Sequence, residues 1–280
     1  MNSVNIENTD WLLSRLGSDI SILDCQPDIY DYLYEHIPNA VYLSDRLWRS
    51  WEGDMPSRYI SPQVAGELLG KAGLNPEKEI AVYSSSGGFS HQGDGLEATM
   101  TTYTLARWGF ANIHLINGGL DLWKSQQKPL TKEFPKKEQT TARLKVQNDY
   151  FLTHQQFLEA REEKNAIVVD VRPPAAYEKS GLWSKTGHIP GAVNIPWKVF
   201  TEHDNPYSYR AREHIEEIVQ ARGASAEKSI ILYCGTGREA TNSFVCFKWL
   251  LGYPEVKIYE GSFTEWCLLN NETVSGKSPW

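Results

Sequence analysis

The sequence predicts an α/β protein with two tandem domains, each a mainly parallel sheet flanked by helices. Two observations support this prediction. Strand-like apolar runs alternate with amphipathic helical patterns throughout the chain, and landmarks of the first half recur in the second. A chain of 280 residues with 41% hydrophobic content is long enough for two domains of ordinary size.

Four landmarks recur in the same order. They are a buried strand with an acidic end, a His-Ile-Pro motif, a second strand with a polar end, and a glycine turn before tryptophan. In the sequence these are Asp24 and Asp170, His36 and His188, Ser84 and Cys234, and Gly118–Trp123 and Gly261–Trp266. The offset varies only from 143 positions at Gly118 to 152 at His36. Chance similarity does not preserve order and spacing in this way, so the chain is a tandem duplication.

The duplication predicts a first domain over residues 1–126, a linker over 127–148 and a second domain over 149–280. The linker is rich in Lys, Thr and Gln and contains Pro129 and Pro135, so we expect it to lie on the surface. In the second domain, Thr153 and Gln156 form a capping-box pattern that predicts a helix start.

The loop that begins at Cys234 is the strongest functional signal. An apolar run ends at Tyr233, and after the loop Ala240, Phe244, Phe247 and Leu251 fall on one helical face. A strand therefore leads through Gly235 and Gly237 into a helix N-terminus. Such a loop can aim amide N–H groups at the sulfur, and the helix dipole adds positive potential, so we expect a thiolate nucleophile.

The other cysteines lack such a loop. Cys246 and Cys267 are interpreted as packing residues, and Cys25 stays open between packing and reactivity. The first half has Ser84 where the second has Cys234, followed by a longer stretch before a helix near Leu96. Because a serine hydroxyl does not ionise at neutral pH without a dedicated base, we expect the first domain to be catalytically inactive.

Composition excludes several other classes. A net charge of −7 argues against nucleic acid as a ligand, and the short basic run 132–137 is expected to be solvated linker. No apolar run reaches the length of a membrane span, and residues 1–20 contain no apolar signal-peptide core. Four cysteines without a C-x-x-C pair predict neither a disulfide framework nor a zinc site. We expect a cytoplasmic protein, where a free thiol stays reduced.

The tandem arrangement, the His-Ile-Pro-Gly-Ala motif at His188, the strand-Cys-loop-helix unit and the closing Gly-x-x-x-x-Trp resemble the two-domain sulfurtransferases. That family comprises rhodaneses and 3-mercaptopyruvate sulfurtransferases, and the resemblance covers residues 8 to 270. It implies that Cys234 is the catalytic residue of a six-residue loop. The active-site residues would then be Gly235, Thr236, Gly237, Arg238, Glu239 and Ala240.

The resemblance also implies donor-binding residues. Arg172 matches the family arginine that contacts the anionic donor, Asp170 is expected to fix the loop that carries it, and Lys185 falls near a second family arginine. His36 could relay a proton to the hydroxyl of Thr236, although its motif more simply indicates a structural ring bonded to a backbone carbonyl.

Within the family, the loop sequence indicates the sulfur donor. The loop start Cys-Gly-Thr-Gly resembles the mercaptopyruvate type, with Thr236 as the hydroxyl counterpart. Arg238 and Glu239 depart from both family patterns, and a cation there could bind the sulfonate end of thiosulfate.

We therefore expect a sulfurtransferase that moves a sulfane sulfur through a Cys234 persulfide, with 3-mercaptopyruvate favoured over thiosulfate. The acceptor would be cyanide, a small thiol or a reduced thioredoxin-like protein, and the chemistry needs no metal or organic cofactor. The alternative is a sulfur-carrier or regulatory rhodanese module, which does not turn over a free sulfur donor. A phosphatase would need Cys-x5-Arg, but Arg238 comes two residues early and Ala240 holds that position.

Overall fold

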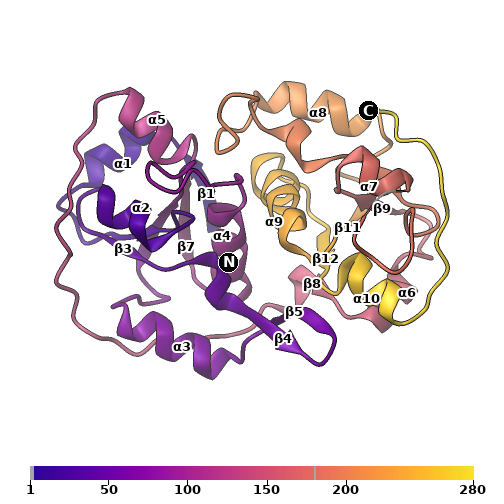
Figure 1. The fold of residues 1–280 in the computed structure, drawn as a ribbon, viewed down its shortest axis with the longest axis horizontal. Helices are drawn as coiled ribbons and strands as arrows, with labels where there is room; N and C mark the ends of the chain where they lie inside the picture. Colours follow the sequence, from indigo (N-terminus) through magenta and orange to yellow (C-terminus); the bar gives the residue numbers. More distant parts are fainter. Residues whose placement is uncertain (1–2, 180) are drawn as a thin grey trace. The chain divides into compact units, whose positions relative to one another are not determined.

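The computed structural model describes residues 3–179 and 181–280, which form two compact units (Figure 1). Unit 1 comprises Met1–Trp48, Tyr59–Gln147 and Glu202–Tyr209. Unit 2 comprises Arg49–Arg58, Asn148–Thr201 and Arg210–Trp280. Each unit thus includes one short segment from the other half of the sequence, 202–209 in unit 1 and 49–58 in unit 2.

Unit 1 is built on a five-stranded parallel sheet in the order β1-β7-β6-β2-β3. The strands are β1 (Ser3–Glu7), β2 (Ser21–Asp24), β3 (Ala40–Tyr42), β6 (Glu79–Tyr83) and β7 (Asn112–Ile116). Its helices are α1 (Thr9–Arg15), α2 (Ile29–Tyr34), α3 (Pro62–Lys71), α4 (Glu97–Arg107) and α5 (Gly119–Ser125), with a 3-10 turn η1 (Asp45–Trp48). Helix α4 begins directly after Leu96, as the sequence predicts.

Unit 2 repeats this plan with the sheet order β10-β9-β11-β12-β8, also parallel. The strands are β8 (Phe151–Leu152), β9 (Ala166–Asp170), β10 (Val193–Asn194), β11 (Ser229–Tyr233) and β12 (Val256–Tyr259). The helices are α6 (His154–Ala160), α7 (Pro174–Glu178), α8 (Arg212–Gln220), α9 (Arg238–Phe244) and α10 (Ser262–Leu268). Shorter turns are η2 (Asn148–Tyr150) and η3 (Trp197–Phe200), and a π-helix η4 (Val245–Leu250) continues α9.

Followed in chain order, the two sheets match strand for strand, with β6 and β11 near the centre. The matching topology agrees with the duplication inferred from the sequence, and the predicted fold class is confirmed. The predicted capping box is also present, because Thr153 and Gln156 bond each other's backbone at the start of α6.

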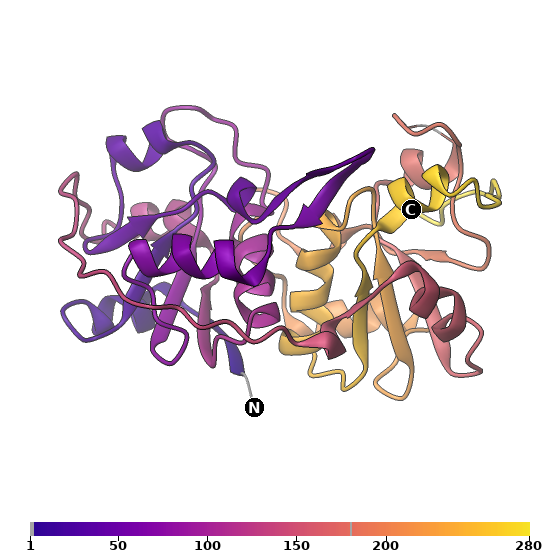
Figure 2. The ribbon, with the colours of Figure 1, turned by 90° about the horizontal axis from the view of Figure 1, so that it is seen from below.

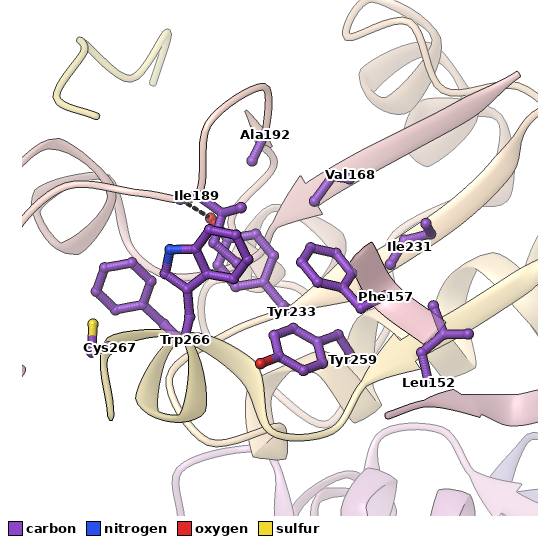
Figure 3. Close-up of a cluster of buried hydrophobic side chains, with 11 residues drawn as sticks. Leu152, Phe157, Val168, Ile189, Ala192, Ile231, Tyr233, Tyr259, Trp266 and Cys267 are labelled. Carbon is purple, nitrogen blue, oxygen red and sulfur yellow. Dashed lines mark hydrogen bonds between the residues drawn. The ribbon is translucent and has the colours of Figure 1, made fainter. Parts of the chain in front are cut away.

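Aromatic packing forms one core of unit 2, which includes Tyr233 at the end of β11 (Figure 3). Phe157 of α6 stacks on Tyr259 of β12 with ring centroids 4.4 Å apart, and Trp266 meets Phe157 edge-on at 5.9 Å. The Tyr233 hydroxyl accepts a hydrogen bond from the Ile189 amide at 3.1 Å and donates to Asp170 at 2.7 Å. Burial of such large rings contributes roughly 1.5–3 kcal/mol each, and here it fixes the strand end from which the Cys234 loop departs.

The corresponding tyrosine of unit 1 makes the same pair of hydrogen bonds. The Tyr83 hydroxyl accepts from the Ile37 amide at 3.1 Å and is hydrogen-bonded to Asp24. Both histidines of the repeated motif are also held alike. His36 stacks on Tyr32 with centroids 3.8 Å apart, and His188 stacks on Tyr177 at 3.6 Å. The duplicated landmarks therefore make the same structural contacts in each unit.

The segment between the halves runs along the surface of unit 1 in irregular conformation. It is anchored by amides of Thr140, Lys145 and Gln147, which donate to carbonyls of unit 1 at 2.8–3.0 Å. Glycine is required where the segment crosses α3. A Cβ atom on Gly70 would lie 2.4 Å from the Thr140 carbonyl oxygen. The linker is thus a surface strap rather than a free tether.

A two-stranded hairpin completes unit 2. Its strands are β4 (Arg49–Glu52) and β5 (Met55–Tyr59), which Figure 2 shows as a long paired ribbon. Arg58 of β5 forms a 2.7 Å ion pair with Glu265 of α10, a carboxylate that is largely buried. This contact ties a segment from the first half of the sequence to unit 2.

Candidate active site

The Cys234 loop lies between β11 and α9 and points amide groups at its own sulfur. Cys234 is buried, with 1% of its surface exposed, and the Gly237 amide donates to its Sγ at 3.1 Å. The amides of Thr236 and Ala240 also bond the sulfur. Gly237 reaches this arrangement with φ of +84°, a left-handed conformation that favours glycine. The amide ring expected from the sequence is therefore present around Sγ.

The backbone carbonyls of the loop are held by the start of α10. The amide of Phe263 donates to the Cys234 carbonyl, and that of Thr264 donates to the Gly235 carbonyl, both at 3.0 Å. The Ser262 hydroxyl accepts from the Cys234 amide at 3.2 Å and donates to the Tyr259 carbonyl at 3.0 Å. Because these partners occupy the outward-facing backbone groups, the remaining amides are free to face the sulfur.

The charge state of the thiol differs from the expectation of a ready thiolate. The pKa of Cys234 is raised to about 11, first by burial and second by the nearby charge of Glu239. The amides of Ala240 and Thr236 and the charge of Arg49 act in the opposite direction. The loop amides therefore do not outweigh desolvation and a neighbouring carboxylate, which together keep the pKa of the thiol above its ordinary value.

Arg172 follows β9 and is fully buried against Asp170. Its Nε lies 3.0 and 3.1 Å from the two Asp170 oxygens, and its Nη2 donates to Asp170 at 2.6 Å and to the Gly187 carbonyl at 2.8 Å. Asp170 also accepts the Arg172 amide at 3.0 Å, so it fixes the loop of Arg172 as the sequence predicts. Burial lowers the pKa of Arg172, but the bonds and charge of Asp170 outweigh it and raise that pKa.

One nitrogen of this guanidinium remains unpaired. Among residues 3–179 and 181–280, Nη1 of Arg172 is buried without a hydrogen-bond partner. An unpaired charged donor of this kind costs about 1–3 kcal/mol or more unless something satisfies it. A negative charge on Cys234 would also raise the pKa of Arg172, so the guanidinium and the sulfur lie within electrostatic range of each other. The group is therefore suited to receive an oxygen of an anionic ligand near Sγ.

Trp183 closes the loop from one side. A Cβ atom on Gly235 would lie 2.5 Å from the indole Cζ2, so only glycine fits beneath this ring. The Trp183 indole N–H donates to Thr264 at 2.9 Å, and the guanidinium carbon of Arg172 lies 5.0 Å from the ring centroid. Trp183 thus shields both the loop and the buried arginine from water.

Arg49 of the hairpin is a site residue that sequence reasoning missed. Its Nη1 donates to the Thr236 carbonyl at 2.5 Å, and it lowers the pKa of Cys234 through its charge. Arg49 lies in the first half of the chain, far from any motif in the sequence. Nothing in the residue pattern marks it, because its role depends on the hairpin belonging to unit 2.

Glu239 and Arg238 occupy the first turn of α9. Glu239 is half-buried and hydrogen-bonded to Cys234 and to Trp197, and burial raises its pKa to about 7. Arg238 is half-buried too, and its carbonyl accepts from the Thr241 hydroxyl at 2.7 Å. The sequence pattern includes both residues in the loop without assigning them a role.

Two other candidate residues have different partners from those expected. The Lys185 ammonium donates to the carbonyls of Asn270 and Asn271 at 2.9 and 2.6 Å, where it secures the end of α10 instead of facing a donor site. His36 is fully buried in unit 1, and its ring nitrogens lie 2.7 Å from the Tyr32 carbonyl and 3.1 Å from the Glu133 carbonyl. These contacts support the structural interpretation of His36 and leave no ring nitrogen for proton relay.

The corresponding place in unit 1 is built differently. The Ser84 hydroxyl donates to the Cys25 carbonyl at 2.9 Å, so it is engaged in a backbone contact. Gln26 takes the place of Arg172 and bonds Asp24 at 3.0 Å. Without a cation there, burial raises the pKa of Asp24 to about 7. Cys25 and Cys246 are buried thiols whose pKa burial raises well above the ordinary value.

Two other kinds of site have no counterpart within the described ranges. No group of three or more His, Cys, Asp or Glu side chains in residues 3–179 and 181–280 is placed to hold a metal ion. In the same part of the chain, no helix combines the length and apolar character that crossing a bilayer requires.

Comparison with known proteins agrees with this architecture. The model of the rhodanese-like domain matches the chain twice, over residues 8–126 and 153–269. A Synechococcus elongatus protein provisionally named a thiosulfate sulfurtransferase is 34% identical over 95% of this chain and 83% of its own length. The 3-mercaptopyruvate sulfurtransferase of Escherichia coli K12 is 27% identical over 95% of this chain and 96% of its own.

Among solved structures, SseA from Escherichia coli, described as showing the rhodanese fold of 3-mercaptopyruvate sulfotransferases, superposes with a TM-score of 0.79 at 24% identity. The match covers 93% of this chain and 99% of that one. Together with the two domain matches, it accounts for both units. The chain belongs to the family of sulfurtransferases built from two rhodanese-like domains.

Proposed function

We propose that this protein transfers a sulfane sulfur from a small anionic donor to a thiophilic acceptor through a persulfide on Cys234. The carrying observation is the convergence of three loop amides on a buried thiol beside a guanidinium with one nitrogen unpaired within the described residues. Of the donors, we favour 3-mercaptopyruvate. The acceptors we propose are cyanide, small thiols and reduced thioredoxin-like proteins, and the compartment we propose is the cytoplasm.

The reaction divides into two displacements. In the first, the Cys234 sulfur attacks the transferable sulfur of the donor, and pyruvate or sulfite leaves. In the second, the acceptor attacks the outer sulfur of the persulfide and regenerates Cys234. A thiol suits this task because sulfur is both a good nucleophile and a good leaving group, and splitting the transfer lowers each barrier.

The loop amides support both steps. In the persulfide the outer sulfur carries negative charge, and the amides of Thr236, Gly237 and Ala240 already face this region. Preorganised N–H groups stabilise such charge without reorganising, as an oxyanion hole does for oxygen. Arg49 bonds the Thr236 carbonyl and so holds the peptide unit that carries the Gly237 amide.

Arg172 is our proposed anchor for the anionic end of the donor. Its Nη1 is buried and unpaired within the described residues, and a carboxylate or sulfonate oxygen would satisfy it. The Asp170 contacts fix the orientation of the guanidinium plane. Because Lys185 is engaged with carbonyls of the α10 end, we do not include it in the donor site.

The choice of donor depends on charge next to the sulfur. Thiosulfate brings two negative charges, one of them at the end that Cys234 attacks, whereas 3-mercaptopyruvate brings a thiol at that end. A carboxylate beside Cys234 disfavours the dianion. The similarity to a protein named as a thiosulfate sulfurtransferase favours thiosulfate as the second candidate.

We also propose that the first domain has no sulfurtransferase activity of its own. Ser84 has a hydroxyl where the second domain has a thiol, and Gln26 cannot supply the charge of Arg172. Its remaining role is then structural.

Intact-mass measurement tests the proposal directly. After incubation with either donor, the wild-type protein should gain the mass of one sulfur atom, and cyanide should remove it. Cys234→Ser should gain nothing, because oxygen does not form the persulfide, whereas the matched variant Cys25→Ser should behave as wild type. A sulfur adduct that persists in Cys234→Ser would place the nucleophile elsewhere. Steady-state constants for the two donors then decide the preference, and a tenfold preference for thiosulfate would reject 3-mercaptopyruvate.

A further inference from the structure

Glu239 is a carboxyl group built into the catalytic loop beside the nucleophile. It is the second residue of α9, and its side chain is half-buried and hydrogen-bonded to the Cys234 thiol. The other partner is Trp197 of η3, which is 3% exposed. Because an indole N–H only donates, the Glu239 oxygen is the acceptor in that bond. The side chain is therefore held in place at the sulfur by a rigid neighbour.

The charges around Glu239 come from three segments. Asp170 at the end of β9 raises the pKa of Glu239, and Arg172 lowers it. Burial has the largest effect and brings that pKa to about 7. Arg49 of the hairpin and the loop amides stabilise negative charge on Cys234. The site thus favours one negative charge, located on the sulfur or on the carboxyl, and disfavours two.

We propose that Glu239 accepts the proton of the Cys234 thiol in the first displacement and thereby selects a protonated thiol donor over dianionic thiosulfate. This inference rests on the proposed persulfide function and deepens it. The position of Glu239 carries it: this residue lies in the same loop as Cys234, at the second position of α9, and is half-buried beside the thiol. It is a carboxyl able to take a proton, whereas the loop amides only donate.

With 3-mercaptopyruvate, the Cys234 proton moves to Glu239, Sγ attacks the donor sulfur, and an S–S bond forms. The donor C–S bond breaks, and its electron pair stays on carbon as the enolate of pyruvate. Glu239 then returns its proton to that carbon. The two sulfurs are oxidised and the carbon is reduced. The products are pyruvate, a Cys234 persulfide that keeps the donor's thiol hydrogen, and a carboxylate ready for the next cycle.

With thiosulfate the Cys234 proton must also leave before Sγ attacks, and Glu239 takes it, but the proton then passes to solvent because no later step needs it. The leaving group of thiosulfate is sulfite, which departs with the electron pair of the S–S bond and has no carbon to protonate. The charge of Glu239 instead opposes approach of the dianion. The carboxyl therefore assists 3-mercaptopyruvate in two proton transfers and thiosulfate in one, which its charge partly offsets, and a purely structural residue would not separate the two donors in this way.

Glu239→Gln is the decisive variant, because the amide is nearly isosteric and can still accept from Trp197 but cannot take the proton. Glu213→Gln is the matched control. Glu213 also lies in the first turn of a helix, α8, but is exposed. Both donors are assayed over pH 6–9, and unfolding in urea checks that each variant is folded.

We expect Glu239→Gln to lower kcat/KM for 3-mercaptopyruvate about a hundredfold at pH 8, within the range typical of acid–base catalysis. The same variant should lower kcat/KM for thiosulfate at least tenfold less, because removal of the opposing charge offsets part of the loss of the base. Alkylation of Cys234 by iodoacetamide should shift to lower pH, since the opposing charge is gone. Glu213→Gln should match wild type in all three measurements.

Equal losses with both donors, or an unchanged rate with 3-mercaptopyruvate, would overturn the assignment. If Glu239→Gln does not fold, the wild-type profiles carry the test. Turnover of 3-mercaptopyruvate should rise more steeply than turnover of thiosulfate as pH increases through about 7, because the charge that forms on Glu239 opposes the dianion. Parallel profiles would refute the inference. Failure of the proposed function is distinguishable, because then neither donor would leave a sulfur atom on Cys234 of the wild-type protein.

Discussion

Arg172 and Asp170 form a buried ion pair that leaves one guanidinium nitrogen of the arginine without a hydrogen-bond partner among the described residues. The pair is closed by Nε and Nη2 of the guanidinium at 2.6–3.1 Å, and both side chains are fully buried. Nη1 has no partner in the part of the chain that the structure describes. The same arginine is therefore needed for stability and is available to an anionic ligand, and these two contributions can be separated by experiment.

Arg172→Ala should affect both folding and donor binding. It leaves Asp170 buried and uncompensated, so we expect the free energy of unfolding to fall by about 3–5 kcal/mol. A lost charge-assisted bond of about 1.5–3 kcal/mol should raise KM for anionic donors roughly ten- to a hundredfold. The stability loss follows from the buried pair with Asp170, which the sequence does not show. Urea unfolding and donor kinetics on the variant measure the two losses.

The double variant Asp170→Asn/Arg172→Met separates the two effects. It removes both charges and keeps side-chain volume, so urea unfolding should recover most of the lost stability while KM stays raised. Recovery of KM together with stability would mean that Arg172 does not contact the donor.

Gly235→Ala should disturb the loop by steric overlap with Trp183. A methyl group there would lie 2.5 Å from the indole, so the ring or the loop must shift. We expect a loss of about 1–3 kcal/mol in the free energy of unfolding, together with lower kcat/KM, since the loop carbonyl bonded to Thr264 moves with it. Adding Trp183→Ala removes the clash and should restore part of the stability in a double-mutant cycle. If the stability losses of the two single variants simply add up in the double variant, the residue at position 235 and Trp183 do not clash.

Arg238→Val restores the neutral residue that the mercaptopyruvate type has at this loop position. We predict little change in the ratio of kcat/KM for 3-mercaptopyruvate and thiosulfate. Loop amides that face the sulfur turn the loop side chains away from it, so we expect the Arg238 side chain to lie away from the donor. The ratio is measured on both proteins at one pH. A shift of tenfold or more toward 3-mercaptopyruvate would show that this guanidinium contacts the donor.

Asp24 should make stability depend on pH. Burial raises its pKa from 3.8 to about 7 in the folded protein, so the folded state binds more protons than the unfolded state between these values. The free energy of unfolding should therefore fall as pH rises from about 4 to about 7. Urea unfolding at several pH values tests this, with Asp24→Asn as the comparison. The variant should show a flatter profile, and identical profiles would contradict the raised pKa.

Much of the organisation follows from the sequence by itself. Repeated landmarks such as His36 and His188 revealed the duplication, because each copy uses the same side chains for the same contacts. The position of Cys234 between an apolar run and a helix pattern located the candidate catalytic loop, since local backbone preferences and glycine placement determine such a turn. Local patterns of this kind are visible directly in neighbouring residues.

Tertiary structure decided the rest. Arg49 reaches the loop from the other half of the chain, and Trp183 covers Gly235, yet neither residue stands in a motif. The pKa of Cys234 could not be predicted from the sequence either. The amides around Cys234 predicted a thiolate, but burial and the charge of Glu239 raise its pKa to about 11. Desolvation and charge depend on which groups share a small volume, and that is fixed only when distant segments pack together.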